Sequence, residues 1–451
     1  MRYLLFIIAI ACSITAFAQG DPVHNDHSPT APGDSTCLNQ RFNIHFQTTY
    51  IYQYKPAFTA PYSSTNSLSG IEEKQNSLTS TLYLGARLWK GAEIYVNPEL
   101  AGGSGLSGAL GMAGSSNGET FRVGNPAPSL YLGRAFFKQT IALGYEKECI
   151  DEDANQLSIK QPKDYLRFYI GKYSLGDLFD NNEFSNSPRE QFMNWALMNN
   201  GAWDYAANVR GYTLAFATEL QLNSMNYKIA SATLPTVANG SKLNTNLDEA
   251  LAINAEISKT YAIRNKTGHV RLLAYHNRAN MGNYVLAMKN LPASDTPDIT
   301  ATRVFSRDKN GFGLNADQEI TNTVGIFARI GYNDGKNETW CFTEIDRSYS
   351  IGLNFDGEGW KRNDDNGGIA LVMNGLSKDH RNYLAQGGSG FILGDGGLNY
   401  APEAIAELYY NIKPVKLPIW ITGDYQFCIN PGYNSDRGPV HVFSLRVHVE
   451  I

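Results

Sequence analysis

Paired carboxylates are the residues in this sequence with the clearest potential for covalent chemistry. Glu93 with Glu99, and Asp177 with Asp180, could cleave a glycosidic bond if a fold held the two carboxyl groups at the required separation. Nothing in the sequence fixes those separations, and a chain with 43 acidic residues contains such pairs by chance. The eight histidines are scattered, and there is no HExxH motif and no phosphate-binding loop. We therefore do not expect an enzyme.

A second group of residues offers hydrogen bonds to a solute instead. TLYLGARLW and AEIYVNPEL alternate apolar and polar side chains, which is typical of strands with one apolar and one polar face. Lys90-Gly91 is expected to be the tight turn that joins these strands into a hairpin. YLRFYIGKY alternates in the same way, whereas the strand around Arg134 is aromatic on both sides, which leaves its orientation open. The candidate solute-binding residues on these strands are Arg87, Glu93, Asn97, Glu99, Arg134, Arg167 and Tyr169.

The strands that must position these side chains recur along most of the chain. From Phe42 onward, alternating segments are separated by Asn, Asp and Gly, as an antiparallel barrel requires. We count about 15 to 17 of them and expect 16, because single-chain bacterial barrels have even numbers of strands. We expect a single all-β domain, a transmembrane barrel over residues 41–451. The Gly- and Ser-rich stretch 101–128 is expected to be a long loop on its outer side.

The last segment, VHVFSLRVHVEI, supports a closed barrel. Phe443, Leu445 and Val447 share one face, and Arg446 and His448 share the other. A soluble sandwich could contain such a strand, but a barrel in lipid needs its last strand to pair with its first, since no open edge is tolerated. Outer-membrane barrels usually end on an aromatic residue, and Ile451 departs from that pattern.

One stretch, Gly171 to Tyr205, does not have the pattern of a strand. Ser187, Pro188 and Glu190 form a helix-start signature, with a capping residue, a proline in the first turn and a capping box. The predicted helix covers about 187–200 and is apolar almost all round, so it should be buried in or against the barrel. It either braces the wall or shapes a passage.

Composition and charge narrow the class of protein. The chain has 26 Tyr, 21 Phe, 6 Trp and 42 Gly, with 18% charged residues. This fits a barrel with aromatic girdles at the membrane interfaces; a secreted all-β protein is the alternative. The net charge of −5 provides no basic face for nucleic acid. No stretch after the N-terminal segment approaches the roughly 20 apolar residues of a membrane helix.

The N-terminal segment predicts export. Arg2, an apolar run and Ala16-Phe17-Ala18 form a signal peptide over residues 1–18, followed by a flexible polar segment over residues 19–40. His24 and His27 in that segment could bind a metal, although a solvated tail explains them better.

Four cysteines remain after removal of the signal peptide. Cys37, Cys149, Cys341 and Cys428 are far apart, with no CxxC spacing. An exported chain could oxidise them in pairs, but the sequence does not say which, and four reduced cysteines fit equally well.

Long motifs resemble one known family. GKYSLGDLFDNN, QFMNWALMNNGAWDY and RGYT are similar to the carbohydrate-selective porins of the OprB family. TLYLGARLWKGAEIYVNPELAGGSGLSGALG, VRLLAYHNRANMGNY and DRGPVHVFSLRVHVEI resemble its Bacteroidota-type branch, so the resemblance covers about residues 42–451. It implies an outer-membrane porin that passes monosaccharides and small oligosaccharides by facilitated diffusion, without a cofactor. The implied partners are small carbohydrates, outer-membrane lipid, the assembly machinery of that membrane and, as a possibility, a homotrimer.

A sugar passage would need hydrogen-bonding groups and aromatic faces. The residues around the central helix that offer them are Trp195, Trp203, Asp204 and Arg210. A Trp beside an acid suits a sugar, because the ring stacks while the carboxylate accepts hydroxyl protons, but Trp at a membrane interface is a competing explanation. For each charged candidate the alternative is a wall salt bridge. The alternative functions are a surface glycan-binding β-protein that transports nothing, or a barrel for acidic polysaccharide or apolar solutes.

Overall fold

The computed structural model describes residues 37–120, 126–291, 296–414 and 417–451. The predicted signal peptide, His24, His27 and residues 19–36 lie outside the described residues. The helices of the described residues are α2 (Trp195–Met198), α3 (Tyr284–Lys289) and α4 (Lys378–Ala385), with short 3-10 turns at Leu106–Gly108, Leu175–Asp177, Thr300–Thr302, Gly357–Trp360 and Pro431–Tyr433. None of these helices is long and apolar enough to cross a membrane.

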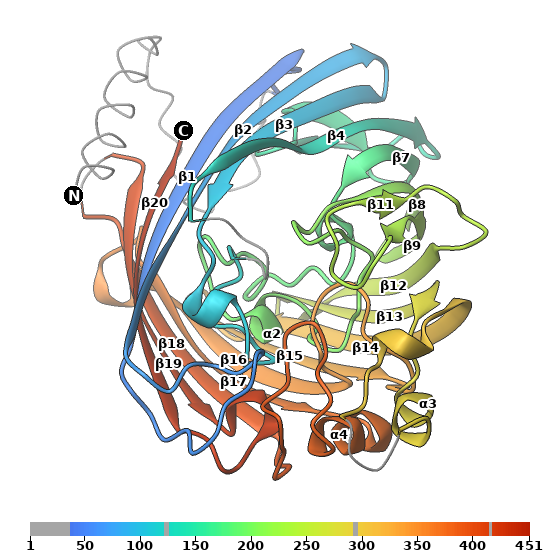
Figure 1. The fold of residues 1–451 in the computed structure, drawn as a ribbon. Helices are drawn as coiled ribbons and strands as arrows, with labels where there is room; N and C mark the ends of the chain where they lie inside the picture. The colour runs from blue at the N-terminus through green and yellow to red at the C-terminus, as the bar shows by residue number, and fades with distance from the viewer. Residues whose placement is uncertain (1–36, 121–125, 292–295, 415–416) are drawn as a thin grey trace. The chain divides into compact units, whose positions relative to one another are not determined.

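Sixteen antiparallel strands of the described residues close into a barrel, which confirms the predicted strand number (Figure 1). In ring order the strands are β1 (Phe42–Lys55), β2 (Glu73–Trp89), β3 (Ala92–Gly102), β4 (Ser129–Ala142), β7 (Tyr165–Tyr173), β8 (Thr213–Leu222), β9 (Met225–Ala232), β12 (Leu251–Ile263), β13 (Lys266–Met281), β14 (Val304–Glu319), β15 (Val324–Asn333), β16 (Arg347–Asp356), β17 (Asn366–Gly375), β18 (Glu403–Ile412), β19 (Ile419–Ile429) and β20 (Val440–Glu450). β20 pairs with β1, with Gln47 opposite Glu450, so the last strand closes the barrel as expected.

Alternation along the strands separates an outer apolar face from an inner polar face. Leu84 and Ile94 are exposed on the outside, whereas Thr81 and Tyr95 are buried on the inside. The apolar side chains of the outer face are not covered by protein because, in a barrel of this kind, they contact lipid. The hairpin turn at Lys90-Gly91 is confirmed, and Gly91 has a φ of +77° that suits glycine.

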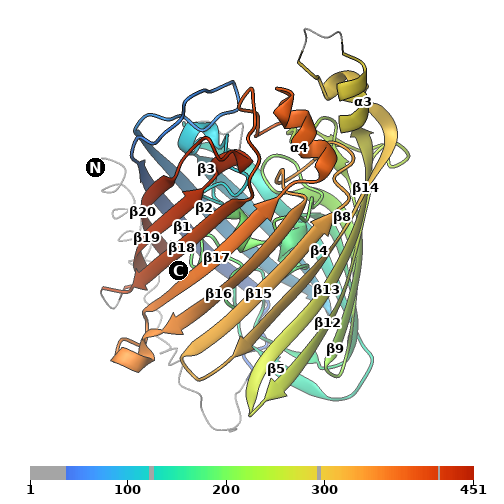
Figure 2. The same ribbon diagram turned by 90° about the horizontal axis from the view of Figure 1, so that it is seen from below.

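The two ends of the barrel differ in the length of their connections. Short turns follow β2, β8 and β12 at one end, where β1 also begins and β20 ends. Long connections follow β3, β7 and β17 at the other end, which also carries α3 and α4 (Figure 2). Short periplasmic turns and long outer loops are typical of outer-membrane barrels, so the first end is the periplasmic one.

Two of the long connections fold into the barrel, between β3 and β4 and between β7 and β8 (Figure 1). The first was expected to be an outer loop, but buried wall side chains draw it inward. Glu403 of β18 accepts hydrogen bonds from the backbone N–H groups of Ala113 (3.0 Å) and Gly114 (2.7 Å). We call the second connection, residues 174–212, the infolded segment; it contains α2.

The predicted helix over 187–200 lies inside the barrel, but only Trp195–Met198 are helical. One turn closes at the predicted start, where the Ser187 carbonyl accepts from the Gln191 N–H (2.8 Å), but the helix does not continue because the barrel wall takes the next carbonyls. Arg446 of β20 donates to the carbonyl oxygens of Pro188 (2.9 Å) and Gln191 (2.7 Å). The true N-cap is Asn194, whose side chain accepts from the N–H of Ala196.

The described residues hold two small sheets in addition to that of the barrel. One is formed by β10 (Leu234–Pro235) and β11 (Leu243–Asn244). The other, formed by β5 (Lys147–Ile150) and β6 (Ile159–Pro162), lies in a separate excursion of the chain at the periplasmic end. A disulfide joins Cys149 in β5 to Cys37, just before β1. The Asn43 side chain also donates to the carbonyl of Gln156 (3.1 Å). The excursion is thus fastened to the start of the barrel. Cys341 and Cys428 are buried and reduced.

The cysteine pairing gives a simple chemical prediction. Alkylation of the unfolded, unreduced chain that begins at Gln19 should modify two cysteines, Cys341 and Cys428, and prior reduction should raise the number to four. In the folded protein neither thiol should react, since both are buried. Mass spectrometry of the alkylated peptides measures each number, and modification of Cys37 without reductant would contradict the assigned pair.

Candidate functional site

A cavity of about 850 Å³ lies between the infolded segment and the wall. Its described lining comes mainly from β1–β4, β7, the excursion at the periplasmic end and both infolded connections, with Glu450 of β20 and residues of two further connections, Asn239, Cys341 and Phe342. Five basic and six acidic side chains are among the described lining residues, so neither sign of charge dominates. They are Arg134, Lys138, Arg167, Arg189, Arg210, Glu99, Glu119, Asp153, Asp177, Glu190 and Glu450.

Arg189 links the infolded segment to the wall across this cavity. Its Nη2 donates to Glu99 of β3 (3.1 Å), and its Nε donates to Glu119 of the other infolded connection (3.0 Å). Its Nη1 donates to the hydroxyls of Thr81 (3.0 Å) and Tyr83 (3.3 Å) of β2. Burial alone would lower the pKa of Arg189, but the carboxylates of Glu119 and Glu99 raise it well above its ordinary value. The guanidinium therefore stays charged, and it fixes the position of the infolded segment.

Other charged groups of the cavity are also paired. Arg134 of β4 makes a two-pronged contact with Asp177, with Nε–Oδ2 and Nη2–Oδ1 distances of 2.7 and 2.6 Å. Arg167 of β7 contacts Glu219 of β8 at 3.4 Å, and the Tyr169 hydroxyl donates to the same carboxylate at 2.8 Å. Pairing leaves the wall rich in hydrogen-bonding groups but near electrical neutrality.

Tyrosine rings and hydroxyls occupy the wall next to these pairs. The hydroxyl of Tyr212 donates to Glu99 at 3.0 Å, and that of Tyr131 donates to the same carboxylate. The guanidinium carbon of Arg210 lies 3.8 Å from the centre of the Tyr131 ring. The guanidinium stacks on one face of the ring, and the planar stack offers a flat outer side that can pack against the apolar face of a sugar ring.

The structure brings some of the predicted site residues to the cavity and leaves others away from it. Those that line it are Glu99, Arg134, Arg167, Tyr169, Trp195 and Arg210. Arg87, Glu93 and Asn97 point to the inside as predicted but are outside the lining. Their polar groups are used locally: Arg87 donates to Asn39, Glu93 pairs with Lys138 (2.7 Å), and Asn97 donates to Asn155 (2.9 Å). For these three residues, the contacts in the structure are with neighbouring protein groups, and contact with a solute stays a prediction.

Trp203 and Asp204 require a correction as well, because both are 1% exposed. The Asp204 carboxylate accepts hydrogen bonds from the backbone N–H groups of Trp340 (2.9 Å) and Cys341 (2.8 Å). The Trp203 indole donates to Asn254 of β12 (2.9 Å). These side chains fasten the infolded segment instead of meeting a solute at the lumen or rim.

Sequence reasoning missed Arg189, Glu119 and Tyr212 as site residues, and it considered Asp177 only as a partner of Asp180 and not as a partner of Arg134. Arg189 lies in the predicted helix start, between Pro188 and Glu190, where a charged residue is ordinary and gives no signal of a site. The others lie on connections, where no alternation marks an inward face.

The first infolded connection also contains the sequence Gly-Ser-Ser-Asn-Gly. Gly114–Gly118 has the spacing of a nucleophile elbow, GxSxG. It lies in a loop instead of a strand-to-helix turn, and the Ser116 hydroxyl donates to the Gln53 side chain (3.3 Å) instead of a histidine. The contacts of Ser116 therefore do not form a catalytic triad.

Comparison with known proteins agrees with this architecture. No curated protein matches the sequence. The high-pH structure of Pseudomonas putida OprB is similar, with a TM-score of 0.68 and 15% identity over 91% of this chain and 94% of that chain. The channel DcaP of Acinetobacter baumannii has a TM-score of 0.49 and 10% identity, over 91% and 97% of the two chains.

The family assignment rests on the sequence match. The model described as "Carbohydrate-selective porin, OprB family" matches residues 66–451. This confirms the resemblance to the OprB family, whereas the Bacteroidota-type branch stays a prediction. The outer membrane is the location that the family and the barrel indicate. The chain belongs to the OprB family of carbohydrate-selective porins.

Proposed function

We propose that this porin passes neutral monosaccharides and small oligosaccharides across the outer membrane by facilitated diffusion. The observation that carries the proposal is the balanced lining of the cavity, with paired charges of both signs next to tyrosine rings and hydroxyls. A sugar is uncharged and rich in hydroxyls, so it gains hydrogen bonds from such a wall without needing a net charge to hold it.

The mechanism follows from exchange of hydration for wall contacts. Arg and carboxylate groups that are already paired keep spare lone pairs and N–H donors, which can replace the water lost by sugar hydroxyls. The Arg210–Tyr131 surface offers packing for the apolar face of the ring. Each contact is weak and near others of the same kind, which allows a solute to enter and also to leave.

The alternative solutes fit this lining less well. An acidic polysaccharide would favour a predominantly basic wall, and an apolar solute would favour an apolar one. The described lining has five basic and six acidic residues together with many polar groups. The other alternative is a glycan-binding barrel that transports nothing, and the recording of single channels distinguishes it from a porin.

The experiment is single-channel recording of the purified protein in a planar bilayer, with glucose and short oligosaccharides titrated on one side. We expect discrete openings that sugars block in a saturable manner, because the wall has a finite number of hydroxyl-binding positions. Openings that no sugar affects would reject the proposed substrate. An absence of openings from folded, inserted protein would favour a glycan-binding barrel without transport.

A further inference from the structure

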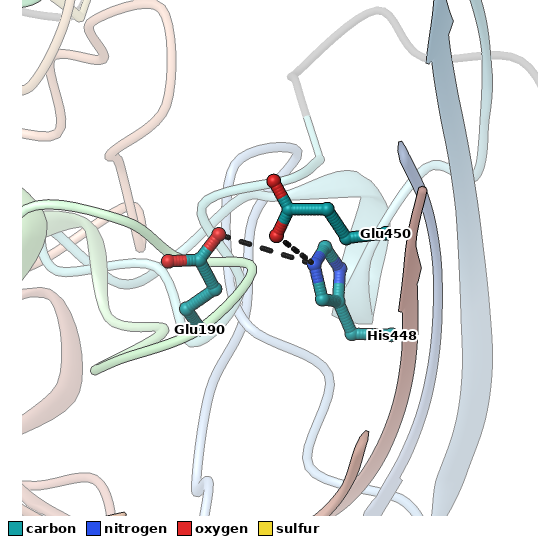
Figure 3. A group of neighbouring side chains, drawn as sticks. All are labelled: Glu190, His448 and Glu450. Carbon is teal, nitrogen blue, oxygen red and sulfur yellow. Dashed lines mark ion pairs between the residues drawn. The ribbon is translucent and has the colours of Figure 1, made fainter. Parts of the chain in front are cut away.

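Three side chains from two parts of the chain meet at the edge of the cavity. Glu190 comes from the infolded segment, whereas His448 and Glu450 come from β20 (Figure 3). His448 Nε2 lies 3.9 Å from Glu190 Oε1 and 3.7 Å from Glu450 Oε2. One ligand atom from each residue lies within 4.8 Å of the others.

The imidazole points into this group with a nitrogen that has no hydrogen-bond partner. The His448 side chain is 3% exposed, and its Nε2 is fully buried and unbonded. Its other nitrogen, Nδ1, lies 2.8 Å from the Thr49 hydroxyl of β1. If Nδ1 carries the proton for this contact, the Nε2 lone pair faces the two carboxylates. Metal-binding histidines are oriented in this way, by a hydrogen bond at the nitrogen that does not bind the metal.

The two distances are within the range of ion pairs but too long for hydrogen bonds, and they leave room for a bridging ion. A charged N–H···O⁻ hydrogen bond is about 2.7 to 2.9 Å long, so neither carboxylate bonds His448 directly. Two ligands of one tetrahedral zinc ion are about 3.4 Å apart, given metal–ligand bonds of about 2.1 Å. The Gln47 side chain donates to Glu450 Oε1 (2.9 Å). This hydrogen bond orients the carboxylate so that its other oxygen, Oε2, faces His448.

We propose that Glu190, His448 and Glu450 form a binding site for a divalent first-row transition-metal ion, with zinc as the probe. The imidazole nitrogen is a borderline ligand that suits such an ion, and zinc also accepts carboxylate oxygens beside histidine, whereas calcium and magnesium prefer oxygen ligands throughout. Glu190 and Glu450 line the cavity, so an ion can reach the site from the passage.

The site has a consequence for the passage because of its place in the chain. Glu190 follows Arg189, the residue that spans the cavity. A bound ion would fasten this part of the infolded segment to the strand that closes the barrel, in addition to the contacts of Arg446 with Pro188 and Gln191. Metal occupancy would thereby restrict movement of Arg189 in the passage.

Isothermal titration of the folded full-length barrel with zinc chloride tests the site. We expect one zinc ion per chain, with binding weakened at least about tenfold in Glu190→Gln and in His448→Gln. The matched control is His441→Gln, because His441 lies on the same strand but on the exposed outer face. Its affinity for zinc should equal that of the unaltered protein. Calcium chloride should give no comparable binding.

Zinc binding that survives both Glu190→Gln and His448→Gln, or no zinc binding by the unaltered barrel, would overturn the proposal. If His448→Gln does not fold, Glu190→Gln decides, since Glu190 lies outside the strands with a side chain 46% exposed. A second measurement follows trypsin cleavage at Arg189: zinc should slow it and EDTA should reverse that effect. The titrations contain no sugar, so their failure and that of the sugar proposal are separate results.

Discussion

Replacing Arg189 with alanine is expected to shift the ion selectivity of the open channel toward cations by about fourfold at low salt. The substitution removes the cation that faces Glu99 and Glu119 and leaves both carboxylates in the cavity. A unit charge about 5 Å from a passing ion contributes about 0.8 kcal/mol in water, which corresponds to the fourfold change. The effect should shrink as salt is raised, because the Debye length falls to about 3 Å at 1 M.

Reversal potentials in a potassium chloride gradient measure this selectivity. Arg87→Ala is the matched control. Arg87, in β2, is an arginine on the inner side of the barrel like Arg189, but it lies outside the cavity lining and contacts Asn39. Arg189→Lys keeps the charge and should preserve the selectivity while loosening the contacts with Thr81 and Tyr83. Equal reversal potentials for Arg189→Ala and the unaltered protein would show that Arg189 does not face the ion path.

The barrel itself could be predicted from the sequence because its signals are local. In β2 and β3 the apolar and polar residues alternate, and lipid on one side with a polar interior on the other dictates that pattern. The same argument placed Arg446 and His448 on the inner face of β20. The Lys90-Gly91 turn was also readable, since only a residue tolerant of positive φ fits there.

The cavity could not be predicted to the same extent, because its contacts join residues that are far apart in the chain. Alternation says that Glu93 and Glu99 share a face, but not that Glu93 meets Lys138 while Glu99 meets Arg189. Asp204 next to a Trp is typical of a sugar contact. Its carboxylate, however, accepts hydrogen bonds from the backbone N–H groups of Trp340 and Cys341. Which polar group stays available to a solute is decided only when the infolded segment packs.

The infolded segment shows most clearly how tertiary contacts overrode a local signal. Ser187 and Pro188 favour a helix start, and one turn forms there, with the Gln191 N–H bound to the Ser187 carbonyl (2.8 Å); Arg446 then binds the carbonyls of Pro188 and Gln191 and ends it. Farther along, Glu407 of β18 accepts from the N–H groups of Met193 (2.5 Å) and Asn194 (3.1 Å). Side chains of the wall therefore bind the backbone N–H and C=O groups that would bind one another in a helix.

Glu407→Ala should consequently release the infolded segment while the barrel stays closed. The substitution leaves two buried N–H groups without an acceptor, at a cost of about 1 to 3 kcal/mol each. No hydrogen bond of the barrel ladder is lost, because those bonds join backbone groups. We expect trypsin to cleave after Arg189 at least about tenfold faster than in the unaltered protein, since a loss of 1.4 kcal/mol already changes an opening equilibrium tenfold.

Release of the infolded segment and closure of the barrel can be measured separately. Cleavage after Arg189 reports release of the segment, whereas resistance of the barrel to unfolding in a cold detergent gel reports the wall. Glu148→Ala is the control, because Glu148 is an exposed carboxylate of β5. Slow cleavage in Glu407→Ala, equal to that of the control, would mean that the contacts of Arg446, Arg189 and Asp204 hold the segment without Glu407. Fast cleavage together with larger single-channel conductance would show that the infolded segment, and not the barrel wall, sets the width of the passage.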